Sequence, residues 1–153
     1  MEWLLDLLNN PFLLTAVSSW LFAQVIKVAI NAVVNKKFSL ERLFGDGGMP
    51  SGHSATVTSL AVITALTYGL DSFNFAVTAI LAIVVCHDAM GVRQETGKQA
   101  VVINEIVKIF TMLSEETLPK VKLKELVGHT PAQVVAGIIL GILNAFVMYY
   151  VIL

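Results

Sequence analysis

Three histidines and the polar residues around them could do chemistry in this sequence, and they fall into three short clusters. The first cluster spans residues 46–54, with the letters DGGMPSGHS, and contains His53. Glycines let the backbone approach an anion closely, and a helix N-terminus presents N–H groups to it. The structural alternative is a flexible loop in which Ser51 only caps the next helix. The candidate phosphate-binding residues here are Gly47, Gly48, Ser51 and Gly52.

The second cluster spans residues 128–133, with the letters GHTPAQ. Thr130 is a good N-cap, Pro131 suits the first helical position, and Gln133 completes a capping box. Helix capping therefore explains these residues but not His129, which directly precedes the predicted helix start. A neutral imidazole at this place is a candidate to attack phosphorus and form a phosphohistidine intermediate.

The third cluster spans residues 87–93, with the letters HDAMGVR, at the end of an apolar segment. An ionisable residue in such a segment is costly in lipid and is a functional candidate by default, which singles out Asp88. Arg93 is a candidate to clamp phosphate oxygens with two hydrogen bonds. Since Arg93 follows Asp88 by about one helical turn, a structural ion pair between them is the alternative.

A polar stripe lies inside the first apolar segment. Gln24, Lys27 and Asn31 recur at i, i+3 and i+7, which places them on one face of a helix. In a membrane helix such a face should point into the bundle. Lys27 then needs a partner, and the two alternatives are Asp88 and a bound anion.

The composition indicates that lipid surrounds the elements that carry these residues. Of the 153 residues, 56% are hydrophobic and 14% are charged. Soluble domains have roughly 25% charged residues. The net charge of −1 excludes nucleic-acid binding driven by bulk charge. The length suits a single membrane-embedded domain over residues 1–153.

Four segments have the length of about 20 mostly apolar residues that a spanning helix needs. Residues 1–9 are too short to span and predict an interfacial helix. Residues 94–125 predict an amphipathic helix that lies on the membrane or packs under the bundle. The predicted fold class is all-α, an integral membrane bundle of about four transmembrane helices plus amphipathic interfacial helices. The predicted spans are 11–34, 51–70, 73–92 and 131–153.

Basic residues in the loops predict the orientation of this cell-membrane protein. Three lie between the first and second spans and six between the third and fourth, so these segments hold nine of the ten Lys and Arg residues. Four spans put both segments on the same side. We expect that side, with all three clusters, to be the cytoplasmic face and both termini to lie outside.

Residues 47–54, 88–100 and 128–137 together resemble the divergent branch of the type 2 phosphatidic acid phosphatase superfamily, which is related to the vanadium haloperoxidases. The second motif of that superfamily, PSGH, is intact at residues 50–53. The resemblance implies an acid-phosphatase-type hydrolase in which His129 is the nucleophile and His53 protonates the leaving oxygen.

The chain departs from the superfamily pattern in its other two motifs. The aspartate that follows the nucleophilic histidine is Gln133 here, the arginine that precedes it is Leu123, and the first motif has no clean match. Gln133 accepts a hydrogen bond but does not offset the positive charge of His129. Either Asp88 takes over that role, or the activity is weak, altered or lost. The replacements for the missing phosphate clamps would be Lys27 and Arg93.

The leading hypothesis is a membrane phosphatase for a phosphomonoester or pyrophosphate of an isoprenyl lipid or glycerolipid, without a cofactor. A second hypothesis is a Mg²⁺-assisted phosphatase with oxygen ligands from Asp46, Asp88 and Glu95. A third is a non-catalytic membrane protein that binds a lipid headgroup or a partner. The spacing Gly137-x-x-x-Gly141 is typical of a helix-packing face, either within the chain or in a homo-oligomer.

Overall fold

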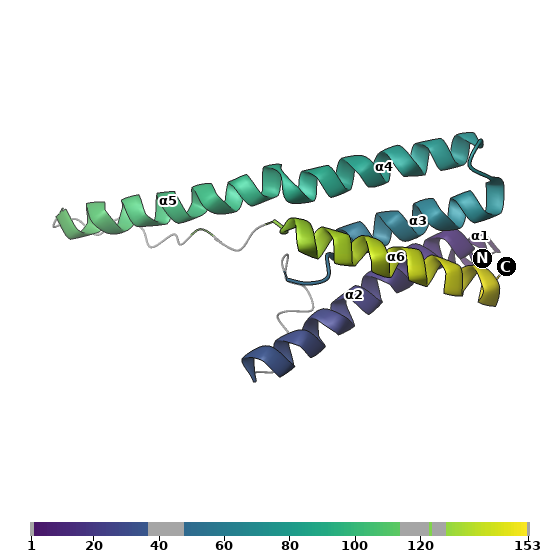
Figure 1. Ribbon diagram of the computed structural model, residues 1–153, viewed down its shortest axis with the longest axis horizontal. Coiled ribbons are helices and arrows are strands. Elements are labelled where there is room, and N and C mark those ends of the chain that lie inside the picture. The colour runs from purple at the N-terminus through teal and green to yellow at the C-terminus, as the bar shows by residue number, and fades with distance from the viewer. Residues whose placement is uncertain (1, 37–47, 114–122, 124–127, 153) are drawn as a thin grey trace.

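The computed structural model describes residues 2–36, 48–113, 123 and 128–152, and helices make up nearly all of them (Figure 1). These residues contain no strand, which confirms the predicted all-α class. The helices are α1 (Glu2–Leu8), α2 (Pro11–Asn35), α3 (Gly52–Tyr68), α4 (Phe73–Met90), α5 (Val92–Leu113) and α6 (Pro131–Ile152).

Helix α3 is the centre of the bundle. It contacts α2, α4 and α6, and α2 and α4 lie on opposite sides of it (Figure 1). The segments Pro11–Val34, Phe73–Leu113 and Pro131–Val151 are long and apolar enough to cross a membrane. Helix α3, the predicted second span, is not among these segments, because it has only 17 residues. Because three neighbours cover α3, it does not need a continuous apolar surface, and it buries several Ser and Thr side chains.

Side-chain caps set where three of the helices begin. The first N–H groups of a helix have no partner within the helix, and a short polar side chain at the N-cap accepts from them. Asn10 accepts from the N–H groups two and three residues on, at 3.0 and 3.1 Å. Ser51 and Ser72 each accept from the N–H three residues on, at 3.3 and 3.1 Å. The polar residues between the apolar runs therefore define the starts of α2, α3 and α4.

Buried hydrogen bonds join α2 to α3 and α6. The Asn144 amide of α6 donates to the Thr15 carbonyl oxygen at 3.0 Å and to the Ser18 hydroxyl oxygen at 3.1 Å. The Ser19 hydroxyl of α2 donates to the Ala55 carbonyl oxygen of α3 at 3.0 Å. Bonds of this kind between membrane helices contribute about 0.6 kcal/mol on average. They hold α2 at the rotation that turns its polar stripe inward.

Helices α3 and α6 run parallel and in close contact along the glycines of α6 (Figure 1). Gly137 and Gly141 are buried. A Cβ atom on Gly141 would lie 2.6 Å from the Ala55 carbonyl oxygen, and one on Gly137 would collide with the Ser51 carbonyl oxygen. The glycine spacing thus serves packing within the chain. Packing within the chain is one of the two predicted alternatives for Gly137 and Gly141, and a homo-oligomer stays a prediction.

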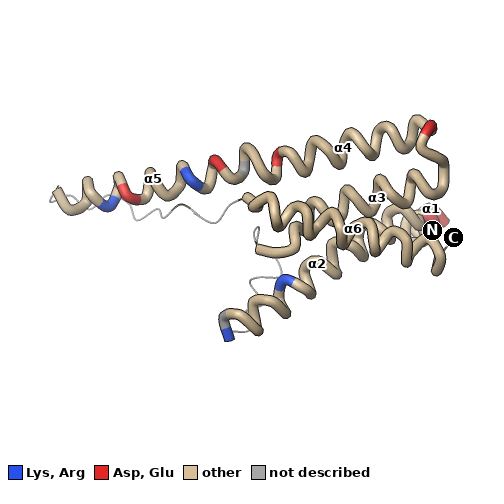
Figure 2. The backbone as a smooth tube through the Cα atoms, viewed as in Figure 1, with Lys and Arg blue, Asp and Glu red and all other residues tan. Residues whose placement is uncertain are grey.

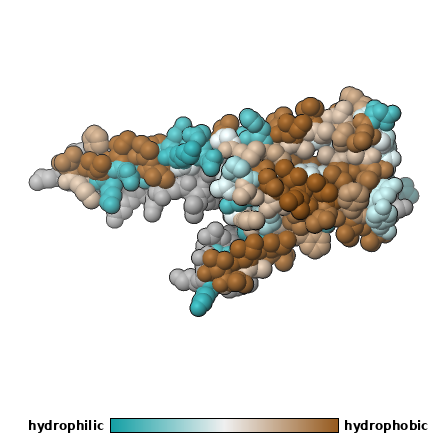
Figure 3. Space-filling model, in the orientation of Figure 1, coloured by the Kyte–Doolittle hydropathy of each residue, from teal (hydrophilic) through white to brown (hydrophobic). Residues whose placement is uncertain are grey.

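Helix α5 continues α4 and extends away from the bundle (Figure 1). Among the described elements it contacts only α4, so the described part of this amphipathic helix does not pack under the bundle. Figure 2 shows charged residues along α5 and none on α3 or α6. In Figure 3, apolar surface dominates the bundle, whereas polar and apolar patches alternate on α5. The amphipathic character predicted for residues 94–125 is therefore present in the described part of that segment.

We expect Gly141→Ala to destabilise the bundle by about 2 kcal/mol, because the new methyl group meets backbone atoms that cannot move aside. Thermal unfolding in detergent measures the effect as a lower melting temperature. The matched control is Val147→Ile, which adds one methyl group to α6 at a side that is 60% exposed and should leave the melting temperature unchanged. Equal melting temperatures for the two variants would contradict the close packing of α6 on α3.

Candidate functional site

The three polar clusters meet at one end of the bundle. Helices α3 and α6 begin at this end, and α2 and α4 run toward it (Figure 1). His53 is the second residue of α3, and His129 lies just before α6. Their ring centroids are 5.8 Å apart, with an interplanar angle of 82°. His129 is 2% exposed and His53 is half-buried, so the two imidazoles meet edge to face at the boundary of the interior.

Two backbone hydrogen bonds join the helices at the level of the histidines. The Ser51 N–H donates to the Gln133 carbonyl oxygen at 2.9 Å, and the His129 N–H donates to the Ala89 carbonyl oxygen at 3.0 Å. The last carbonyl groups of a helix have no partner within it, and His129 satisfies one of those of α4. The position of His129 is therefore fixed by the end of α4 as well as by the start of α6.

The two parallel helix starts bring positive partial charge to the histidine pair. A helix N-terminus carries about half a unit of positive charge, and its N–H groups bind anions. Helices α3 and α6 both begin at the histidine pair, so their contributions add. These two helix starts are therefore candidates to bind an oxyanion, although neither helix contains a Lys or Arg residue.

Ser51 differs from its predicted role. Its backbone N–H was expected to hold a phosphate, but it donates to the Gln133 carbonyl oxygen. Its side chain accepts from the Ser54 N–H at 3.3 Å and from the Ser54 hydroxyl at 3.0 Å. Ser51 thus caps α3 and joins α3 to α6, and we remove its N–H from the candidate phosphate donors.

Lys27 lies directly beneath Gly48 of the first cluster. It is 5% exposed, Gln24 is 4% exposed, and Asn31 is half-buried, so the polar stripe of α2 faces inward as predicted. Gly48 has a φ of 96°, and a Cβ atom on it would lie 3.3 Å from the Lys27 Cγ atom. The backbone at Gly48 therefore rests on the aliphatic stem of Lys27. Gly47 lies outside the described residues.

Asp88 and Arg93 flank the junction between α4 and α5. Asp88 is half-buried in the last turn of α4, next to the alanine whose carbonyl binds the His129 N–H. Arg93 belongs to the first turn of α5, and its side chain is outside the described part of the chain. The junction thus brings the backbone of the third cluster to the histidine pair.

The Mg²⁺ hypothesis receives few ligands from the described residues. Within residues 2–36, 48–113, 123 and 128–152, no three His, Cys, Asp or Glu side chains come together to hold a metal ion. Glu95 pairs with Lys98 at 2.7 Å on the exposed side of α5. Asp46 lies outside these ranges, so Asp88 is the one proposed ligand near the histidines whose side chain is described.

Gln133 stands where the superfamily pattern has an aspartate. In this protein its side chain has a structural role at the start of α6. Its side-chain oxygen accepts from the Thr130 N–H at 3.1 Å, and its own N–H donates to the Thr130 hydroxyl oxygen at 3.4 Å. These reciprocal bonds are the predicted capping box. Gln133 therefore stabilises the start of α6, immediately after His129.

Trp20 of α2 also belongs to this region, and the sequence analysis missed it. A Cβ atom on Gly52 would lie 3.3 Å from the Trp20 Cδ1 atom, so the buried Gly52 lets the indole approach the start of α3. Tryptophan in membrane proteins is enriched at the membrane–water interfaces. A tryptophan well inside a predicted span was the signal that could have drawn attention to it.

Comparison with known proteins finds a family model and a relative that match this chain. Residues 8–144 match the model of a family described as "Divergent PAP2 family". The chain is also 44% identical over 155 residues to a protein of Bacillus subtilis (strain 168) named "Uncharacterized membrane protein YuiD". That match covers 95% of this chain and 98% of the relative. No solved structure matches the chain.

We expect Gly48→Ala to lower the stability of the protein by about 1 kcal/mol or more, because alanine is strained at a positive φ and its methyl group would press on Lys27. The measurement is the melting temperature in detergent. Met49→Ala is the matched control, since Met49 is the next residue and is 47% exposed. If both variants melt at the temperature of the wild type, Gly48 does not pack on Lys27 as described.

Proposed function

The chain belongs to the divergent PAP2 family, and on this premise we propose that it is a membrane phosphatase for a lipid phosphate. The substrate is a phosphomonoester or pyrophosphate of an isoprenyl lipid or a glycerolipid. The observation that carries the proposal is the contact between His53 and His129, which come from helix starts far apart in the sequence. Two imidazoles that close together can act on the same phosphate group.

His129 is the nucleophile in the proposed reaction. Its imidazole nitrogen attacks phosphorus, and a P–N bond forms while the bond from phosphorus to the lipid oxygen breaks. His53 donates a proton to the departing oxygen. The lipid then leaves as an alcohol from a phosphomonoester, or as a monophosphate from a pyrophosphate. Water that has given a proton to His53 then attacks the phosphohistidine, which releases inorganic phosphate and restores both histidines.

Positive charge around the pair supports this assignment. A phosphate dianion taken out of water needs cationic or hydrogen-bonding partners. In the proposed site these partners are the buried Lys27, the backbone of Gly48 and Gly52, and the starts of α3 and α6, with Arg93 and Gly47 as further proposed ligands. Asp88 takes the role of stabilising the charge that develops on His129, because the Gln133 side chain bonds within its own capping box.

The test is release of inorganic phosphate from lipid phosphates by the purified protein in detergent. We expect His129→Gln to abolish release and His53→Gln to slow it by roughly a hundredfold or more, as loss of a general acid does. His87→Gln is the matched control, because His87 is exposed on α4 and should leave the rate unchanged. Wild-type rates in both His53→Gln and His129→Gln would rule out the histidine mechanism.

The same assay includes an arm with a chelator and an arm with orthovanadate. Full activity in the chelator and inhibition by vanadate, which mimics phosphate, are the results expected for the proposed mechanism. Loss of activity in the chelator would instead favour the Mg²⁺-assisted mechanism with Asp46 and Asp88.

Binding of a lipid phosphate without turnover is the second candidate function. The observation that favours it is the Gln133 capping box, since a glutamine there cannot supply the negative charge that the superfamily aspartate provides. Equilibrium binding of a lipid phosphate with no phosphate release from any lipid in the panel would identify this function.

The cytoplasmic orientation of the site is part of the proposal, and a single cysteine tests it. Lys36 is exposed at the end of α2 on the side of the site, and Cys86 is the only natural cysteine. In a Cys86→Ser, Lys36→Cys variant, we expect a membrane-impermeant thiol reagent to label permeabilised cells and not intact ones. Labelling of intact cells would place the site on the outer face.

A further inference from the structure

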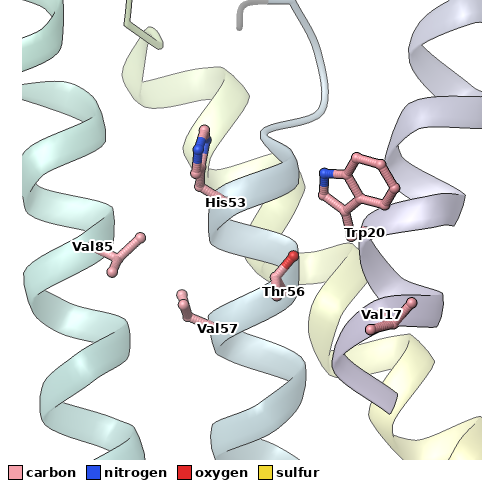
Figure 4. Close-up of a pocket in the computed structure, with 6 residues that line it drawn as sticks. All are labelled: Val17, Trp20, His53, Thr56, Val57 and Val85. Carbon is pink, nitrogen blue, oxygen red and sulfur yellow. The ribbon is translucent and has the colours of Figure 1, made fainter. Parts of the chain in front are cut away.

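An apolar groove crosses the surface of α3 between α2 and α4 (Figure 4). Its volume is about 370 Å³, within the range of small-molecule sites. Helix α3 forms the floor, α2 forms one wall, and α4 forms the other. The lining residues are Val17, Trp20, His53, Thr56, Val57 and Val85.

The groove and the histidine pair share His53. In Figure 4 the His53 ring lies at one end of the groove, and Val17 and Val57 lie farther along, toward the middle of the bundle. The centroid of the His53 ring is 5.8 Å from that of His129. A molecule in the groove would therefore have one end at the candidate phosphate site and the other inside the membrane-spanning part of the protein.

The lining suits hydrocarbon rather than water. None of the six lining residues is an acid, a lysine or an arginine. The Thr56 hydroxyl donates to the Gly52 carbonyl oxygen at 2.8 Å, so its hydrogen is already used within α3. Apolar walls favour an apolar occupant, because removing such surface from water is what stabilises burial. The polar end at His53 then has to be matched by a polar group on the same molecule.

The opening of the groove suits an occupant that comes from the bilayer. Helices α2 and α4 are separated by α3 and make no contact with each other in the described part of the chain. The indole of Trp20 reaches the start of α3 because Gly52 has no side chain, which completes the α2 wall. A chain can therefore enter sideways between α2 and α4 while its headgroup stays at the membrane boundary.

We propose that this groove binds a single hydrocarbon chain of the lipid whose phosphate lies at His53 and His129. The proposal rests on the proposed function for the headgroup and adds that the protein recognises the tail as well. The apolar groove thereby makes the protein prefer a lipid phosphate with a long chain over a short, water-soluble phosphate.

Tryptophan fluorescence tests chain binding without relying on catalysis. Trp3 is the only other tryptophan, so in a Trp3→Phe variant the emission comes from Trp20 in the groove wall. The probe is a long-chain alkyl phosphate with bromine atoms on its hydrocarbon chain, added to the full chain in detergent. We expect saturable quenching, because bromine quenches tryptophan on contact.

Two adjacent valines of α4 provide matched variants. Val85 lines the groove, whereas Val84 is 58% exposed and does not line it. Each buried methylene is worth roughly fourfold in affinity, so a Val85→Phe ring that displaces about two methylenes should weaken the affinity measured by quenching roughly fifteenfold. Val84→Phe should leave it unchanged. Val57→Phe, from the floor, is a second blocking variant if Val85→Phe does not fold.

The outcomes separate the groove from the phosphatase. Equal quenching in Val85→Phe and Val84→Phe, or quenching that never saturates, overturns the groove. Phosphate release whose preference for long over short alkyl phosphates survives Val85→Phe also overturns it, while the phosphatase stands. Saturable quenching that Val85→Phe weakens, with no release of phosphate, supports the groove and removes the phosphatase.

Discussion

The close packing of α6 on α3 is the constraint on which the site depends. Gly137 and Gly141 have no side chains, so the two backbones approach until an added Cβ atom would strike the carbonyl oxygen of Ser51 or Ala55. Because the helices run parallel, both N-termini lie at the same end and their partial positive charges add. Each start carries a histidine, and the close backbones bring the two imidazoles into contact. Bulkier side chains between the helices would separate the starts and, with them, the histidines.

Helix α2 contributes polar residues with two different tasks. In its first half, Thr15 and Ser19 take part in hydrogen bonds to α6 and α3 that fix how the helix is rotated. In its second half, the same inward face presents Gln24 and Lys27 to the end that holds the histidines. A buried cation is costly in lipid, which makes Lys27 a functional candidate. The structural bonds of the first half therefore position the charge of the second half beneath the Gly48 backbone.

The chain belongs to the divergent PAP2 family. Its candidate site combines residues that match the superfamily motifs with residues that depart from them. The PSGH motif is kept at residues 50–53, where it combines a helix cap, a close approach to Trp20 and a histidine in one turn. The aspartate position holds Gln133, whose side-chain oxygen accepts from the Thr130 N–H at the start of α6. The end of α4, where Asp88 lies, is joined to His129 by the backbone bond to the Ala89 carbonyl oxygen, so Asp88 is the candidate for charge compensation in the proposed mechanism.

Sequence and tertiary structure decided different parts of this protein. The sequence by itself determined the helical class, most helix boundaries to within a few residues, the inward stripe of α2 and the choice of His53 and His129 as candidates. Apolar run length, caps and short motifs are local, so they can be read without a fold. Only the tertiary structure decided that the Ser51 N–H is used by Gln133, that the glycines of α6 face α3, and that Trp20 borders the site. Each of these depends on residues far apart in the chain, whose distance is set by the packing of whole helices and by no local pattern.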